Sequence, residues 1–384
     1  MRFFLMTALL ALTLPAATAS AAPSAEETRL RQAVEHLVAS QKSAFEKTGG
    51  TFAASGDMMI EKAGSYYAVT LPDITLIHPN RAQTALGLIA LNASPAGEGR
   101  WNITMALPTP IVTKGQDGAV QSELLLGQQF FSGRWDEKFR NFTSLKTLYQ
   151  NVILRLPQSG AGQPFSSATI AKMGYGFDLS DTSKDKTDLA FRLGIEGLKA
   201  VGLSPAHAKL FPSDATVNID VKDLPIDKLG DIQKNLLTPG EMAGSPLWLT
   251  QLLSQSGSEA VINTIQLKNA ETGLNLTGRV KPSPTSPLQH TGKLTLDVSR
   301  IDQLLLGLNS AAANSPPSEQ GKLQALRVAL TMMSALGQNT SGEGGAVKRY
   351  DVEMTPDGKV MMNGTDFSAV IGGVTQATGR KAAR

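Results

Sequence analysis

Hydrophobic and polar residues alternate with a period of two along the chain from about residue 51 to residue 179. Residues 66–71, 86–91 and 101–107 show this alternation most clearly. Successive side chains of a strand point to opposite faces, so the pattern predicts β-strands. Turn-forming residues such as Asp117-Gly118 separate the segments, which favours an antiparallel meander. Residues 128–135 predict another strand, and residues 145–156 fit either a strand or a helix.

Several of these strands carry apolar residues on both faces. Tyr66-Tyr67 and Phe130-Phe131 are adjacent pairs, so each pair sends one ring to each side of the sheet. We therefore expect both faces to be covered, by helices, by a second sheet or by an apolar ligand. Ordinary burial on both faces is the simplest of these interpretations.

The best single helix spans residues 24–47. Ser24 and Glu27 have the spacing of a capping box, in which each side chain accepts a hydrogen bond from the other residue's backbone N–H. Leu30, Val34 and Leu37 form an apolar stripe at helical spacing, which predicts one buried face.

The second half of the chain mixes strands with helices. Residues 175–180 and 187–198 predict a hairpin around the polar turn at 181–186, and residues 350–363 predict a closing hairpin. A break is expected at 309–317 and a loop at 339–345. Strands are expected at 216–222, 262–268, 274–280 and 292–299, and helices at 226–237, 246–253, 301–308 and 322–336.

The first residues resemble a secretory signal. Arg2 supplies a positive charge, residues 3–14 are apolar apart from two threonines, and small residues follow Pro15. Ala19 and Ala21 fit an A-x-A cleavage site, so we expect cleavage after Ala21. The alternative, a transmembrane anchor, needs about 20 apolar residues, and this run is shorter. The expected location is therefore the periplasm, without a transmembrane segment in the mature chain.

Composition excludes several kinds of chemistry and of partner. The 384 residues contain no cysteine and four histidines, so disulfides, thiolate nucleophiles and Cys-ligated metals are absent. Only 18% of the residues are charged, and removal of residues 1–21 would leave a net charge of +2. A nearly neutral chain gives no reason to expect nucleic-acid binding.

No catalytic motif stands out. The chain lacks G-x-S-x-G, a phosphate-binding G-x-x-x-x-G-K-[ST] and the dinucleotide fingerprint. One S-x-x-K match, at 183–186, falls in the polar turn, where chance is the simplest explanation. The acids of that region, Asp178 to Asp188, lack calcium-loop spacing. The histidines, His36, His78, His207 and His290, are too far apart for a helical zinc motif and are expected at the surface. We therefore expect no catalytic residues, cofactor or metal.

A short pattern of apolar, acidic, apolar and polar residues occurs four times. Because the acids alternate with apolar neighbours, solvent-facing strand positions are the simplest interpretation. The functional alternative is a carboxylate cluster, which requires the four strands to be adjacent. The acids are Asp178, Asp220, Asp297 and Glu353.

Several segments of the sequence resemble two groups of envelope proteins. Residues 274–280, a Pro-rich turn, residues 292–299 and the following helix are similar to the strand repeats of AsmA-like proteins. Residues 354–364 and 64–72 resemble an uncharacterised alphaproteobacterial periplasmic family of unknown function. The resemblance covers most of 51–371 as a pattern and implies a β-rich envelope protein. It brings no catalytic signature, and the chain departs from AsmA-like proteins in lacking a transmembrane anchor.

The expected fold is α+β and dominated by strands: a long antiparallel meander sheet with an N-terminal helix and several packing helices in the second half. Residues 22–371 would form one elongated body, which the Gly- and Gln-rich stretch at 157–164 would divide into lobes at 22–160 and 161–371. Residues 372–384 would be a flexible basic tail.

Three functions are compatible with this sequence. The first is a non-catalytic periplasmic protein that binds a hydrophobic ligand such as a lipid along its sheet. The second is an envelope assembly scaffold or protein-interaction module without a small ligand. The third is a hydrolase of an envelope polymer, which would need a cleft with converging titratable groups. The sequence does not identify the ligand-binding residues.

Overall fold

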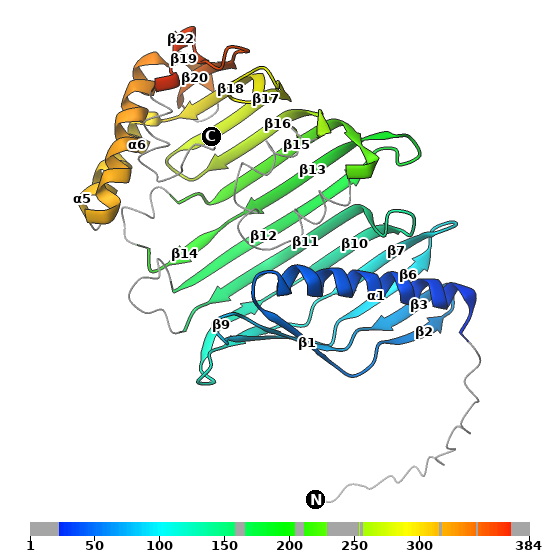
Figure 1. Ribbon diagram of the computed structural model, residues 1–384. Coiled ribbons are helices and arrows are strands. Elements are labelled where there is room, and N and C mark those ends of the chain that lie inside the picture. The colour runs from blue at the N-terminus through cyan, green and yellow to red at the C-terminus, as the bar shows by residue number, and fades with distance from the viewer. Residues whose placement is uncertain are drawn as a thin grey trace, which may run out of the picture.

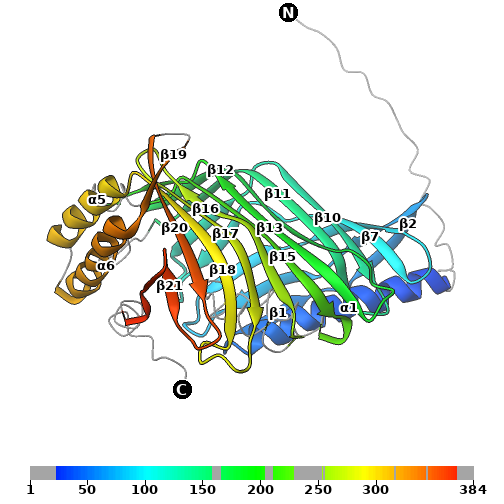
Figure 2. The same cartoon turned by 90° about the horizontal axis from the view of Figure 1, so that it is seen from above.

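The computed structural model describes residues 23–157, 166–203, 211–228, 253, 256–314, 317–342 and 345–369. Within them, the strands form one antiparallel sheet, with a helix along one end and two helices beyond the other (Figures 1 and 2). This confirms the strand-dominated fold class, the antiparallel sheet and the N-terminal helix.

The helices are α1 (Ala25–Glu46), the short 3₁₀ turn η1 (Ile226–Lys228), α5 (Ile301–Asn314) and α6 (Pro317–Leu336). The strands are β1 (Thr51–Ser55), β2 (Met59–Ala63), β3 (Tyr66–Thr70), β4 (Asp73–Ile77), β5 (Gln83–Gly87), β6 (Ala90–Pro95), β7 (Arg100–Ala106), β8 (Ile111–Lys114), β9 (Val120–Leu125), β10 (Gln129–Asp136), β11 (Asn141–Arg155), β12 (Ser167–Leu179), β13 (Lys186–Glu196), β14 (Lys199–Val201), β15 (Asp214–Pro225), β16 (Glu259–Lys268), β17 (Gly273–Pro282), β18 (His290–Ser299), β19 (Gln338–Gly342), β20 (Gly345–Met354), β21 (Val360–Met362) and β22 (Thr365–Asp366).

The first ten strands are five long strands, each interrupted once. β2 pairs with β3 while β1 pairs with β4, and the same double pairing repeats as the chain continues to β9 and β10. The interruptions coincide with residues that break a ladder. Gly56 and Gly87 have positive φ values of 86° and 70°, and Pro72 and Pro108 lack a backbone N–H.

From β11 onward one further strand is interrupted: β12 pairs with β13 and then with β14, on either side of Gly197, whose φ value is 66°. β11 pairs with β10 along its first part and with β9 near its end, and it pairs with β12 along most of its length. β13, β15, β16, β17, β18 and β20 then follow in order. The two halves expected as lobes therefore share the β11–β12 ladder.

Helix α1 packs across the first part of the sheet (Figure 1). Its N-cap is Ser24, whose Oγ accepts a hydrogen bond from the Glu27 backbone N–H at 3.1 Å, as the capping box predicts. Leu30 and Val34 are buried in a core that includes Tyr67 and other strand residues. The Tyr67 hydroxyl also donates to Glu26 of the helix at 2.9 Å, so an apolar contact and a polar contact both fix α1 on the sheet.

The helices of the second half are fewer than the sequence suggests. Within the described residues there are two, α5 and α6, besides the turn η1, so the expectation of several packing helices was too high. The expected helix at 226–237 begins with η1, but the remainder lies outside the described residues. The expected helix at 246–253 lies outside them too, except for Leu253, which is helical and buried.

Two expected irregular segments are regular. Residues 309–314 continue α5 because three alanines, good helix formers, follow Ser310, and Ala311 is fully buried. Residues 338–342 form β19, which pairs with β20. The polar side chains of β19 suggested a loop, but backbone hydrogen bonds to β20 are what hold this short edge strand. The closing hairpin of β20 and β21 is confirmed.

The sheet has one buried face. Tyr67 and Phe131 are buried, whereas their neighbours Tyr66 and Phe130 are 41% and 47% exposed. The expectation that both faces are covered is therefore wrong for these pairs. The second ring of each pair lies on the solvent side, where a single large apolar side chain is ordinary.

Candidate ligand-binding face

The four recurring acids do not form a carboxylate cluster. They lie on β12, β15, β18 and β20, and β15 is separated from β18 by two strands. Three of them face a base on the neighbouring strand instead: Asp220 with Arg192 at 2.8 Å, Asp297 with Arg349 at 2.8 Å, and Glu353 with Lys293 at 3.4 Å. The fourth, Asp178, is exposed. The polar face therefore carries cross-strand ion pairs, which confirms the solvent-facing interpretation.

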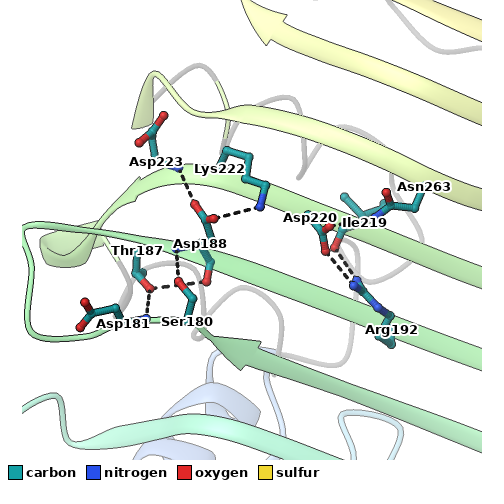
Figure 3. A network of polar contacts seen from close by, with 10 residues as sticks. All are labelled: Ser180, Asp181, Thr187, Asp188, Arg192, Ile219, Asp220, Lys222, Asp223 and Asn263. Carbon is teal, nitrogen blue, oxygen red and sulfur yellow. Dashed lines mark hydrogen bonds and ion pairs between the residues drawn. The ribbon is translucent and has the colours of Figure 1, made fainter.

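A larger polar network joins β13, β15 and β16 on that face (Figure 3). The Lys222 ammonium group donates to Asp188 at 2.9 Å, and this hydrogen bond lowers the pKa of Asp188. For Asp220, burial acts to raise the pKa, but hydrogen bonds from Asn263 and Arg192 outweigh it, so the pKa is lowered. These carboxylates stay ionised and paired, which suits a structural role rather than proton transfer.

The turn at 181–186 is polar and exposed, as expected. Asp181 accepts hydrogen bonds from the backbone N–H and the hydroxyl group of Ser183, at 2.9 and 2.6 Å, and pairs with Lys184 at 3.2 Å. The hydrogen bonds from Ser183 are the main reason that the pKa of Asp181 falls to about 2. Ser183 thus stabilises an exposed turn, and the S-x-x-K match has no buried setting that would activate a nucleophile.

The histidines have structural surroundings. His36 is exposed and its ring contacts Trp135 edge-on, with the ring centroids 6.4 Å apart. His78 shares a hydrogen bond of 2.8 Å with the Thr84 hydroxyl. His290 is only 6% exposed, so its expected surface position is wrong; its Nδ1 atom lies 3.1 Å from the carbonyl oxygen of Leu288. His207 lies outside the described residues. In the part of the chain that the structure describes, no group of three or more His, Asp or Glu side chains could hold a metal ion.

The opposite face of the central strands carries a continuous apolar surface. Two parallel rows of side chains cross β12, β13, β15, β16 and β17 at the same height, and we call these ten residues the apolar stripe. The first row is Tyr175, Leu193, Val217, Ile265 and Leu276, and the second is Met173, Ile195, Ala215, Leu267 and Leu274.

Strand register places these residues side by side. Tyr175 pairs with Leu193, and Leu193 pairs with Val217. Val217 then pairs with Ile265, and the register shifts between Ile262 and Thr264. In a regular strand, residues three positions apart would point to opposite faces. The bulge adds one residue to β16, so Ile262 and Ile265 both point to the apolar face. The stripe is therefore continuous across all five strands.

The stripe is less buried than the sheet at either end. Nine of its residues are half-buried and Leu267 is 40% exposed. On the flanking strands, Tyr149 and Val298 are buried. Burial also raises the pKa of the hydroxyl group of Tyr175, which belongs to the stripe. The alternation in the sequence predicted an apolar face, but not that its centre would be partly open.

The described helices give no membrane span: none is both long and apolar enough to cross a bilayer. In comparisons with known proteins, no family model, curated protein or solved structure matches the chain.

Proposed function

We propose that this protein is a non-catalytic binding protein of the bacterial cell envelope, which holds a hydrophobic ligand such as a lipid against the apolar stripe. The observation that carries the proposal is the stripe itself: ten neighbouring apolar side chains, nine of them half-buried, between two more deeply buried parts of one sheet. Export through the expected signal sequence, with cleavage after Ala21, would place the chain in the periplasm.

The dimensions of the stripe suit an acyl chain. Neighbouring strands lie about 4.8 Å apart, so the path from β12 to β17 is about 19 Å long. One leaflet of a bilayer is about 15 Å of hydrocarbon, so one extended acyl chain would lie along a row. The ion pairs of the opposite face stay in water, which makes the apolar face the one available for such a ligand.

A second candidate is a protein-interaction module of the envelope. The observation that favours it is on the helices α5 and α6, where Leu306, Val328 and Met332 are 58%, 54% and 45% exposed. Exposed apolar side chains on neighbouring helices are typical of a surface that meets a partner. A hydrolase is a weaker alternative, since the carboxylates of the polar face are paired with bases rather than poised for proton transfer.

Lipid analysis of the purified protein tests the first proposal. The mature chain would be released from the periplasm without detergent, extracted with organic solvent and examined by mass spectrometry. We expect near-stoichiometric lipid in the wild type and a loss of most of it in Val217→Asp, which puts a charge into the stripe. Thr216→Asp is the matched control, because this exposed neighbour points to the opposite face. A wild-type protein free of lipid would contradict the proposal and favour the interaction module.

A further inference from the structure

A pocket of about 670 Å³ lies between helix α1 and the turn that joins β10 to β11. This volume is within the range of sites that hold small molecules. Arg29, Glu35 and His36 line it from the helix, and Trp135, Glu137 and Arg140 line it from the sheet. The pocket shares no residue with the apolar stripe, so a ligand bound in it is independent of a lipid on the stripe.

Local structure fixes both walls. Residues 30 and 34 of α1 point into the core, so residues 29 and 36, seven positions apart, share a neighbouring face of the helix. On the other side, Asp136 accepts a hydrogen bond from the Lys138 backbone N–H at 2.9 Å and another from Arg100 at 3.1 Å. These bonds hold the turn that presents Glu137 and Arg140 to the pocket.

The charged side chains of the pocket are incompletely paired. Among the described residues, Arg29, Arg140 and Glu35 make no ion pair or side-chain hydrogen bond. Glu137 accepts a hydrogen bond from the indole N–H of Trp101 at 2.8 Å through one carboxylate oxygen. The pocket therefore offers two guanidinium groups and a carboxylate, all on solvent-exposed side chains.

Trp135 adds a buried donor. The residue is 2% exposed, and its indole N–H has no hydrogen-bond partner in the described part of the chain. Trp101, on the neighbouring strand, does have one. An unpaired buried donor costs about 1–3 kcal/mol. The nitrogen itself has almost no accessible surface, so Trp135 contributes other atoms to the pocket wall.

We propose that this pocket binds a small zwitterion that carries both an oxyanion and an ammonium group. The guanidinium groups of Arg29 and Arg140 favour a carboxylate or phosphate, which accepts charge-assisted hydrogen bonds. Glu35 and Glu137 favour an ammonium group, which also interacts well with the face of an indole ring. A ligand of one sign would leave the opposite charges of the pocket unpaired. An amino acid and a phosphoethanolamine headgroup share the required chemistry.

Calorimetric titration of the full exported chain with four probes tests the charge requirement. Glycerophosphoethanolamine and L-alanine carry both charges, glycerol 3-phosphate carries only the anion, and ethanolamine only the cation. We expect one zwitterion to bind at least tenfold more tightly than either probe of one sign. The preferred zwitterion then identifies the source, because only the first contains the lipid headgroup. Equal affinity for a probe of one sign, or no binding of any probe at about 10 mM, would overturn the proposal.

Variants test the residues. Arg140→Gln and Glu35→Gln should each weaken zwitterion binding at least tenfold. Arg134→Gln is the matched control, since Arg134 lies on the same strand as Trp135 but is exposed outside the pocket. Wild-type affinity in Arg140→Gln would show that the pocket does not use its guanidinium groups.

Discussion

At the scale of single residues, the two most deeply buried tyrosines differ in one hydrogen bond. Tyr350 is fully buried and its hydroxyl group has no hydrogen-bond partner in the described structure, whereas the Tyr67 hydroxyl donates to Glu26 at 2.9 Å. We expect Tyr350→Phe to raise the free energy of unfolding by up to about 1 kcal/mol, because it removes an unsatisfied polar group. Tyr67→Phe, the control, should lower it by about 1 kcal/mol. Urea denaturation of both variants measures this difference, and a loss of stability in Tyr350→Phe would contradict it.

The buried hydroxyl group of Tyr350 should also make the free energy of unfolding depend on pH in the alkaline range. Burial raises the pKa of Tyr350 to about 12, whereas a tyrosine in the unfolded chain titrates near pH 10. The unfolded chain therefore loses this proton first, so the free energy of unfolding should fall as the pH rises from about 10 to about 12. This fall should be smaller in Tyr350→Phe. Equal pH profiles for the two proteins would show that the hydroxyl group ionises without cost in the folded state.

At the scale of elements, two glycines in the central strands have opposite roles. Gly278 in β17 has φ +139°, and an added Cβ would lie 2.7 Å from the Cα atom of Leu294 on β18. Gly194 in β13 has open space at the corresponding point. We expect Gly278→Ala to cost about 2 kcal/mol or more, and Gly194→Ala to add up to about 1 kcal/mol, because alanine loses less backbone entropy in a strand. Thermal unfolding of the two variants checks the contrast, and equal melting temperatures would rule it out.

The elements were also the level at which the sequence was most informative. The alternation in residues 101–107 and the helical spacing of Leu30 and Val34 correctly predicted β7 and α1. A period of two places the apolar side chains on one face of a strand, and a period of 3.6 places them on one face of a helix. The strand β19 was missed, since its backbone pairing with β20 leaves no trace in its polar side chains. The apolar stripe could be anticipated as an apolar face. The pocket at Trp135 could not, because it depends on residues a hundred positions apart.

At the scale of the whole molecule, the surface pattern follows from the sheet being a single layer. Charged residues such as Arg192 and Asp220 pair across strands on one face, and the hydrophobic core covers the other. Adjacent aromatic pairs suggested two covered faces because sequence does not say which side a helix will protect. The layer instead leaves one face to water, and the stripe lies at the least protected part of the buried face.

The continuous core predicts that the two halves of the sheet unfold together. Leu30 of α1 is fully buried in a cluster that extends from β3 in the first half to β16 in the second. Leu30→Ala should lower the free energy of unfolding by about 2–5 kcal/mol. Because β11 and β12 join the halves by a long ladder, hydrogen exchange should report the same loss for the slowest amides of β3 and of β15. Leu306→Ala, at an exposed site on α5, should leave both unchanged. A loss confined to β3 and its neighbours would mean that the halves on either side of residues 157–167 are independent lobes despite the strands they share.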